Sequence, residues 1–319
     1  MNRQNETYAD KVKERLRKKV DREWLGGTLK RPGKSAVYNH PDIFREPGRN
    51  LMDGLFPIPQ SVKGTLTEAI LNDERVGHLV SSLAMCISYF KRFFLTPAGE
   101  TAFLRILTRL GINLKGAEIQ NAAFELLPSE VYRNDSVKHP YDQTHFDFFL
   151  ELTDGRRIFW EIKYTEAGFG KISASEKHPD RYVKQWQNVY SKLYQTSAYR
   201  NSENPVCTED YICLKEGRLT ACCAREASCA IHEFFSHYQI RRNIVWAQHA
   251  DDHVFFLTPR ENTSLDSERA YIETYANQYG KGYIHNLYWE DLLFITLEET
   301  AGDSLLHHYY LRFKNKYLD

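Results

Sequence analysis

The chain has 319 residues, of which 42% are hydrophobic, and its 42 Lys and Arg balance 42 Asp and Glu. This composition is typical of a globular protein with one enlarged domain, or of a core domain with an appended part. It gives no global basic signal for nucleic acid, and no apolar run is long enough to cross a membrane. Because the first residues lack the apolar segment of a signal peptide, we expect an intracellular, cytoplasmic protein.

Positive charge is concentrated at the start of the chain. Residues 1–34 hold 11 Lys and Arg against 5 Asp and Glu, while the remaining residues are slightly acidic. Residues 7–24 are predicted to form a helix. Such a basic helix can lie on a phosphate backbone, although a solvated helix face is an equally good interpretation.

Hydrophobic periodicity predicts the main elements in chain order. One long buried helix is expected over 65–95, followed by a helix with Thr96 as N-cap, Pro97 at its first position and Gly111 at its end. Strands are predicted at 117–128, 144–152, 156–164 and 252–259, and a further strand at 283–289. Further helices are predicted over 180–199, 229–250, 265–279 and 298–316. This order predicts an α/β layer arrangement.

The organisation expected from these elements has three parts. Residues 1–95 form a helical and irregular extension, 96–259 the core with a helical insertion at about 165–225, and 260–319 a C-terminal helical part packed on the core. Five cysteines and two histidines lie in or near the insertion, but no two ligands are spaced as in most zinc sites. Free thiols are therefore favoured over a zinc site; these residues are Cys207, Cys213, Cys222, Cys223, Cys229, His232 and His237.

Charged residues interrupt two apolar strands at 144–164, where Asp147, Glu161 and Lys163 occur. A charge on a core strand is costly unless it is compensated. A three-residue loop, Thr153-Asp154-Gly155, places Asp147 opposite Glu161, whereas a two-residue Asp-Gly turn places them on opposite faces. We prefer the first register because it also aligns the apolar faces. Two adjacent carboxylates repel each other, and a divalent cation such as Mg²⁺ cancels that repulsion.

The pattern Asp147, then Glu161-Ile162-Lys163, resembles the PD-(D/E)XK nuclease superfamily of restriction-endonuclease-like fold. The expected order over about 96–259 is also that of the family core: a helix, three antiparallel strands, a helix and a strand. The resemblance implies that Asp147, Glu161 and the carbonyl of Ile162 bind Mg²⁺, for which Mn²⁺ can substitute. It implies that Lys163 assists the nucleophilic water.

The resemblance also suggests weaker candidates around the motif. Relatives often add an acid from the preceding helix or the first strand, which points to Glu100 or Glu125. Many place a glutamine on the helix after the Glu-x-Lys strand, for which Gln239, beside Arg242, and Gln185 compete. Tyr164 and Glu166 are candidates for supporting roles next to Lys163. Each of these residues is equally compatible with an ordinary exposed or structural position.

These observations predict a Mg²⁺-dependent endonuclease that acts on DNA, with a possible homodimer as the working form. Three alternatives remain. The hairpin charges can form a surface ion pair, the fold can serve as a catalytically inactive binding module, or Asp147 and Glu161 can act as a metal-free acid and base.

Overall fold

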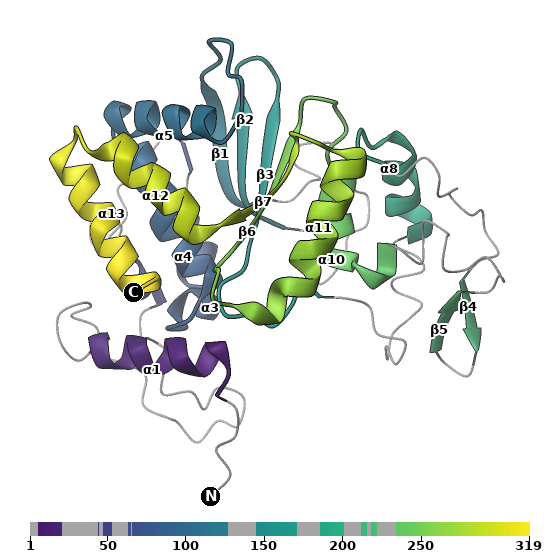
Figure 1. The fold of residues 1–319 in the computed structure, drawn as a ribbon, viewed down its shortest axis with the longest axis horizontal. Coiled ribbons are helices and arrows are strands. Elements are labelled where there is room, and N and C mark those ends of the chain that lie inside the picture. Colours follow the sequence, from purple (N-terminus) through teal and green to yellow (C-terminus); the bar gives the residue numbers. More distant parts are fainter. Residues whose placement is uncertain are drawn as a thin grey trace, which may run out of the picture.

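A five-stranded sheet forms the centre of the computed structural model, which describes residues 6–20, 44, 47–52, 63–64, 66–126, 145–170, 186–200, 212–215, 218–221 and 234–319. The strand order is β1-β2-β3-β6-β7 (Figure 1). The first three strands are antiparallel, and β6 and β7 run parallel to β3. Their bounds are β1 Ile119–Leu126, β2 Phe146–Leu152, β3 Arg157–Ile162, β6 His253–Thr258 and β7 Ile284–Tyr288.

Helices cover both faces of this sheet, as Figure 1 shows, so the predicted α/β class is confirmed. Side chains alternate along each strand, so Phe148 and Trp160 pack in one apolar cluster while Phe149 and Phe159 pack in the other. The first cluster includes residues of α4 (Ser82–Phe90), α5 (Pro97–Arg109), α12 (Trp289–Thr300) and α13 (Ser304–Tyr317). The second includes residues of α10 (Tyr238–Val245) and α11 (Asp266–Tyr279).

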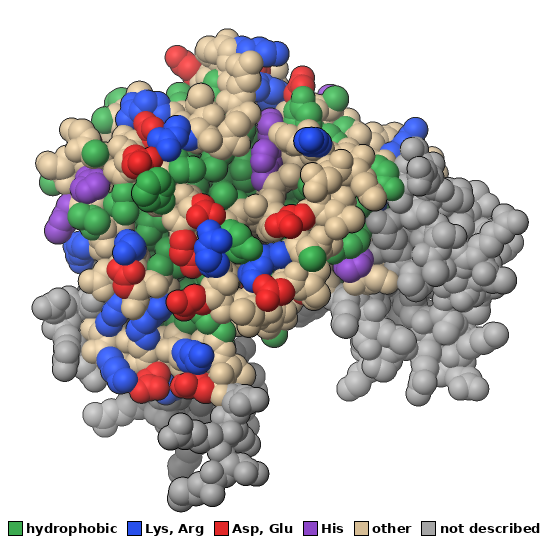
Figure 2. All heavy atoms as spheres, viewed as in Figure 1, with side chains coloured by type: hydrophobic (Ala, Val, Ile, Leu, Met, Phe, Trp, Pro, Cys, Tyr) green, Lys and Arg blue, Asp and Glu red, His purple; other side chains and the backbone are tan. Residues whose placement is uncertain are grey.

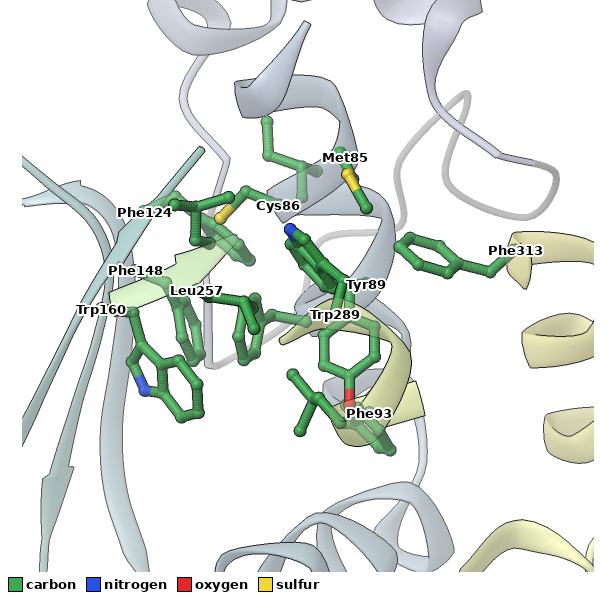
Figure 3. Packing of buried hydrophobic residues seen from close by; sticks show 14 of the residues in the cluster. Met85, Cys86, Tyr89, Phe93, Phe124, Phe148, Trp160, Leu257, Trp289 and Phe313 are labelled. Atoms are coloured by element: carbon green, nitrogen blue, oxygen red, sulfur yellow. The ribbon is translucent and has the colours of Figure 1, made fainter. Parts of the chain in front are cut away.

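The first cluster is rich in aromatic rings, and Figure 3 shows α4 packed between the sheet and the C-terminal helices. Phe90 of α4 stacks on Phe148 of β2 with ring centroids 4.1 Å apart. Phe93 stacks on Tyr310 of α13 at 4.9 Å. Burial of such large side chains contributes most of the stability of a domain. The sheet therefore has a rigid support beneath the strands that carry Asp147 and Glu161.

The predicted continuous helix over 65–95 is wrong. It is divided into α2 (Glu68–Leu71), α3 (Glu74–Gly77), α4 and a 3₁₀ helix, η2 (Lys91–Leu95). Thr67, Asp73 and Ser81 are N-caps in extended conformation, and each accepts a hydrogen bond from a backbone amide of the helix that follows. The apolar period continues through these breaks because each short helix packs apolar residues against the first cluster, although those of α2 are only partly buried. Periodicity alone therefore does not reveal a capped break.

The helix after this region has the predicted ends. Thr96 accepts a hydrogen bond from the amide of Gly99, Pro97 begins α5, and Gly111 has a φ of +92°. The helix predicted at 298–316 corresponds to α13, which begins later because Asp303 caps it through the amides of Leu305 and Leu306. The preceding helix, α12, was not predicted.

Residues from all three predicted parts of the chain pack together in one core. The first cluster unites buried residues of α1 (Tyr8–Val20), α4, the sheet and α13, and β7 from the last part is a strand of the central sheet. The boundaries at 95 and 259 therefore do not coincide with breaks in the core. No helix in the described part of the chain is long and apolar enough to span a membrane.

The predicted helical insertion contains a two-stranded ribbon as well as helix. A π-helical turn, η3 (Trp186–Tyr190), leads into α8 (Ser191–Thr196), and β4 (Ile212–Lys215) pairs antiparallel with β5 (Arg218–Ala221). Gln185, Cys207, Cys222, Cys223, Cys229 and His232 lie outside the described residues, as does the Cys213 side chain.

The hairpin between β2 and β3 has the predicted register. Gly155 has a φ of +84°, its amide donates to the carbonyl of Leu152, and the Leu152 amide donates to Arg156. Phe148 pairs with Trp160 and Phe149 with Phe159. A three-residue loop that ends in a left-handed glycine sets this pairing, and the pairing places Asp147 opposite Glu161.

Candidate active site

Three carboxylates lie in one row across neighbouring strands. Phe124 pairs with Phe148 and Leu126 with Phe146, so Glu125 of β1 faces Asp147 of β2. The β2–β3 register extends this row to Glu161 of β3. Glu161 lies on the face of the sheet that α10 and α11 cover, because Phe159, two residues earlier, packs in their cluster. The row therefore comes from local strand pairing.

Glu161 is buried, and donors satisfy both of its carboxylate oxygens. The side chain amides of Gln239 and Asn243, one turn apart on α10, donate to Oε1 and Oε2 respectively, both at 2.5 Å. Lys163 Nζ also donates to Oε1, at 2.6 Å. Charge-assisted hydrogen bonds of this kind compensate the cost of burying a carboxylate. These hydrogen bonds explain how the strand tolerates an acid at position 161.

Lys163 is held as a cation. Its side chain is buried, and Nζ lies 5.4 Å from the centre of the Phe169 ring. Burial lowers the pKa of Lys163, but the carboxylates of Glu161 and Asp147 outweigh it and raise the pKa above its usual value. A lysine in this state stabilises negative charge and donates hydrogen bonds. It is not a general base in this arrangement.

Asp147 lies where β2 and β3 separate. Its Oδ2 accepts a 2.6 Å hydrogen bond from the amide of Ile162, while the pairing of β2 with β3 ends at Phe148 and Trp160. Burial and the Glu161 carboxylate raise the pKa of Asp147 well above its usual value, against the opposing charge of Lys163. A buried acid whose pKa is raised by a neighbouring carboxylate favours a bound cation.

The oxygen atoms around this separation fit a hard divalent cation. Because the N–H and C=O of a strand residue point to the same side, the carbonyl of Ile162 faces β2, as does its amide. The metal ligands that the sequence predicts are thus two carboxylates and one carbonyl, which are hard oxygen ligands of the kind that suits Mg²⁺. Within the described ranges, no group of three or more His, Cys, Asp and Glu side chains is arranged to hold a metal ion. The predicted Mg²⁺ ligands are smaller in number: two acidic side chains, Asp147 and Glu161, and the carbonyl of Ile162.

Glu125 has other partners as well as its place in the row. Its Oε2 lies 3.0 Å from Arg75 Nη2 and 3.3 Å from His145 Nδ1. Its backbone has a φ of +49°, an uncommon conformation for a residue with a side chain. Such strain is found at functional sites when the surrounding structure enforces it. The structure thus brings Glu125 to the site, but as part of an ion-paired group.

The remaining predicted residues are distributed differently. Glu100 pairs with Lys63 at 2.5 Å and has no contact with Asp147 or Glu161 among the described interactions. Glu166 accepts from the amide of Tyr164, and the Tyr164 hydroxyl donates to the carbonyl of Tyr317. These two residues therefore fix the chain that leaves Lys163. Gln239 contacts Glu161, as the predicted position implied.

Asn243 was missed by the sequence analysis. Its side chain is fully buried, and its Oδ1 has no hydrogen-bond partner among the described residues. The sequence feature that indicates Asn243 is its position four residues after Gln239, which places both side chain amides on one face of a helix. Cys86 was not predicted either, and its thiol donates to the carbonyl of Asp147 at 3.4 Å. It lies on the opposite side of β2 from Glu161, in the first apolar cluster.

The fold and the site together define a mixed α/β protein with an acid–acid–lysine group at a strand separation. The family model described as restriction endonuclease associating with ARP matches residues 18–318. The chain therefore belongs to this restriction-endonuclease family, which supports a nuclease-like role. Neither the curated proteins nor the solved structures contain a match to the chain.

Proposed function

We propose that this protein is a Mg²⁺-dependent endonuclease of the PD-(D/E)XK type that hydrolyses phosphodiester bonds in DNA. The observation that carries the proposal is the alignment of Asp147 and Glu161 across two strands with Lys163 bonded to Glu161. The order of α5, β1, β2, β3, α10 and β6 is also that of a restriction-endonuclease-like core.

Asp147, Glu161 and the carbonyl of Ile162 would hold the cation, and Mn²⁺ would substitute for Mg²⁺. A bound divalent ion lowers the pKa of its water ligand and offsets charge on a phosphate. Gln239 and Asn243 orient Glu161 toward the separation between the strands. The hydrogen bond from Ile162 orients Asp147 in the same way.

Lys163 would stabilise the negative charge that develops on the phosphate and orient the attacking water. Its raised pKa keeps it protonated at neutral pH. A preorganised cation in a partly buried site stabilises transition-state charge more strongly than the same cation does in water. This role requires the charge of Lys163 rather than its basicity.

The complete set of acids and lysine disfavours a catalytically inactive binding module. The family description names association with ARP, and we include such a partner, or a second copy of this chain, in the proposal. A homodimer would let two sites cut the two strands of a duplex.

The proposal is tested with supercoiled, linear and single-stranded DNA incubated with wild type and Lys163→Ala, with Mg²⁺ or with EDTA. Wild type should nick or linearise DNA only with Mg²⁺, and Lys163→Ala should be slower by at least 100-fold, the scale of a lost charge-stabilising group. Cleavage that persists in EDTA, or that Lys163→Ala retains in full, contradicts the proposal.

A further inference from the structure

We infer that α1 is a fixed DNA-binding element that contacts backbone phosphates beside the active site through Lys11 and Lys18. This inference rests on the proposed function and names a binding surface for its substrate. The helix carries six Lys and Arg against two acids in 13 residues. Figure 2 shows Lys and Arg side chains gathered over α1 at the lower left of the molecule.

The position of α1 is set by two of its cations. Arg15 Nη2 donates to the carbonyl of Tyr317 at 2.6 Å, and Lys19 donates to Asn315, whose side chain oxygen lies at 2.9 Å. Both acceptors lie in the last turn of α13, where free carbonyls attract cations. Val12 and Leu16 are buried in the first apolar cluster. The helix is thus docked by an apolar stripe and by capping of α13.

The same docking places α1 next to the catalytic strand. Arg15 Nη2 also donates to the hydroxyl of Tyr164 at 3.2 Å, and Tyr164 directly follows Lys163. Consecutive Cα atoms are about 3.8 Å apart, so one tyrosine side chain and one peptide separate Arg15 from the backbone of Lys163. A duplex that enters the site therefore passes close to α1.

Lys11 and Lys18 do not cap α13. They are seven residues apart, two turns of the helix, and so share one side of it. Lys11 is exposed, and the Lys18 side chain is 73% exposed. Lys18 also pairs with Glu14 at 2.7 Å. An exposed ion pair of this kind contributes little to stability, so a phosphate can readily replace Glu14 as the partner of Lys18.

The dimensions of the helix suit a duplex. Thirteen residues span about 20 Å, and each DNA strand carries one phosphate per roughly 3.4 Å of axis, so several phosphates fall within the length of α1. Burial raises the pKa of the Tyr8 hydroxyl, and the charges of Glu290 and Glu261, which lie near it, raise it further. Because these acids repel a polyanion at the start of the helix, Lys18 should make the stronger contact.

The test compares two double variants that each remove two positive charges. Lys11→Gln/Lys18→Gln changes the proposed surface. Lys115→Gln/Lys281→Gln changes a hollow of about 450 Å³ that the loops before β1 and β7 help to line. Binding of a labelled 30-base-pair duplex is measured in EDTA at several salt concentrations. The full-length protein is used throughout.

Lys11→Gln/Lys18→Gln should weaken binding about 10- to 30-fold near 0.15 M salt and reduce the salt slope by about 1.8, since each lost phosphate contact removes about 0.9. Lys115→Gln/Lys281→Gln should bind as wild type does. An unchanged affinity and slope for the first variant, or an equal loss for the second, overturns the inference. Mg²⁺-dependent cleavage by wild type in the same preparation would leave the proposed function standing in that case.

Discussion

Removal of the Asn243 amide should weaken metal binding without removing any proposed ligand. Asn243 donates to Glu161 Oε2 at 2.5 Å, while Gln239 and Lys163 both donate to Oε1. Asn243→Ala therefore leaves one oxygen of a buried carboxylate without a donor. A lost partner for a buried charged group costs about 1.5–3 kcal/mol, and Glu161 is expected to rotate toward its two remaining donors.

The expected effect on the metal follows from that rotation. Loss of a group that orients a metal ligand typically lowers metal affinity about 10- to 100-fold. The Mg²⁺ concentration for half-maximal DNA cleavage should rise by this factor in Asn243→Ala. Binding of Mn²⁺ without DNA, followed by calorimetry, should weaken to a similar extent. The second measurement separates metal binding from catalysis.

A matched control distinguishes orientation of Glu161 from general stability. Asn50 is also fully buried, and its amide donates to the carbonyls of Val76 and His78 rather than to Asp147 or Glu161. Asn50→Ala should lower the free energy of unfolding comparably, with the Mg²⁺ requirement unchanged. If both variants shift the Mg²⁺ requirement equally, or neither does, the assigned role of Asn243 is refuted.

Two further predictions concern stability. His253 and His285 share a hydrogen bond, and burial lowers their pKa values to about 4 and about 3. The unfolded chain takes up these protons below about pH 6.5 and the native state does not. Stability should therefore be full above that pH and fall by on the order of 4 kcal/mol between pH 7.5 and pH 5, about 2 kcal/mol for each histidine; urea unfolding at these two pH values should show the fall, and His285→Phe should reduce it. Asp252 pairs with buried Arg157 at 2.9 Å, so Asp252→Ala should cost about 3–5 kcal/mol; a loss below 1 kcal/mol in urea unfolding would contradict this.

Local rules account for the part of the site that the sequence predicted. The loop Thr153-Asp154-Gly155 fixes the register within one hairpin, and register alone places Asp147 opposite Glu161. No distant contact enters that inference. Thr96 and Gly111 were predictable for the same reason, because helix ends are set by neighbouring residues.

Distant contacts account for what the sequence did not predict. Asn243 is 82 residues from Glu161, and packing of the second apolar cluster brings residues of α10 and β3 together. The positive φ of Glu125 and its bond to Arg75 depend on how α3 docks beside β1. A helix break such as Asp73 is in principle visible as a cap, but the apolar period across 65–95 masks it.

The burial of Glu161 also shapes how a cation would enter the site. In this arrangement Glu161 is neutralised by Lys163, and Asp147 has a raised pKa. A divalent ion at the proposed site would therefore compete with the ammonium group of Lys163 for the Glu161 carboxylate. In the proposed mechanism, this competition would release Lys163 from Glu161 and leave its ammonium group able to contact a phosphate. The ion pair that stabilises a charged strand without metal would thus keep the proposed catalytic lysine beside the substrate.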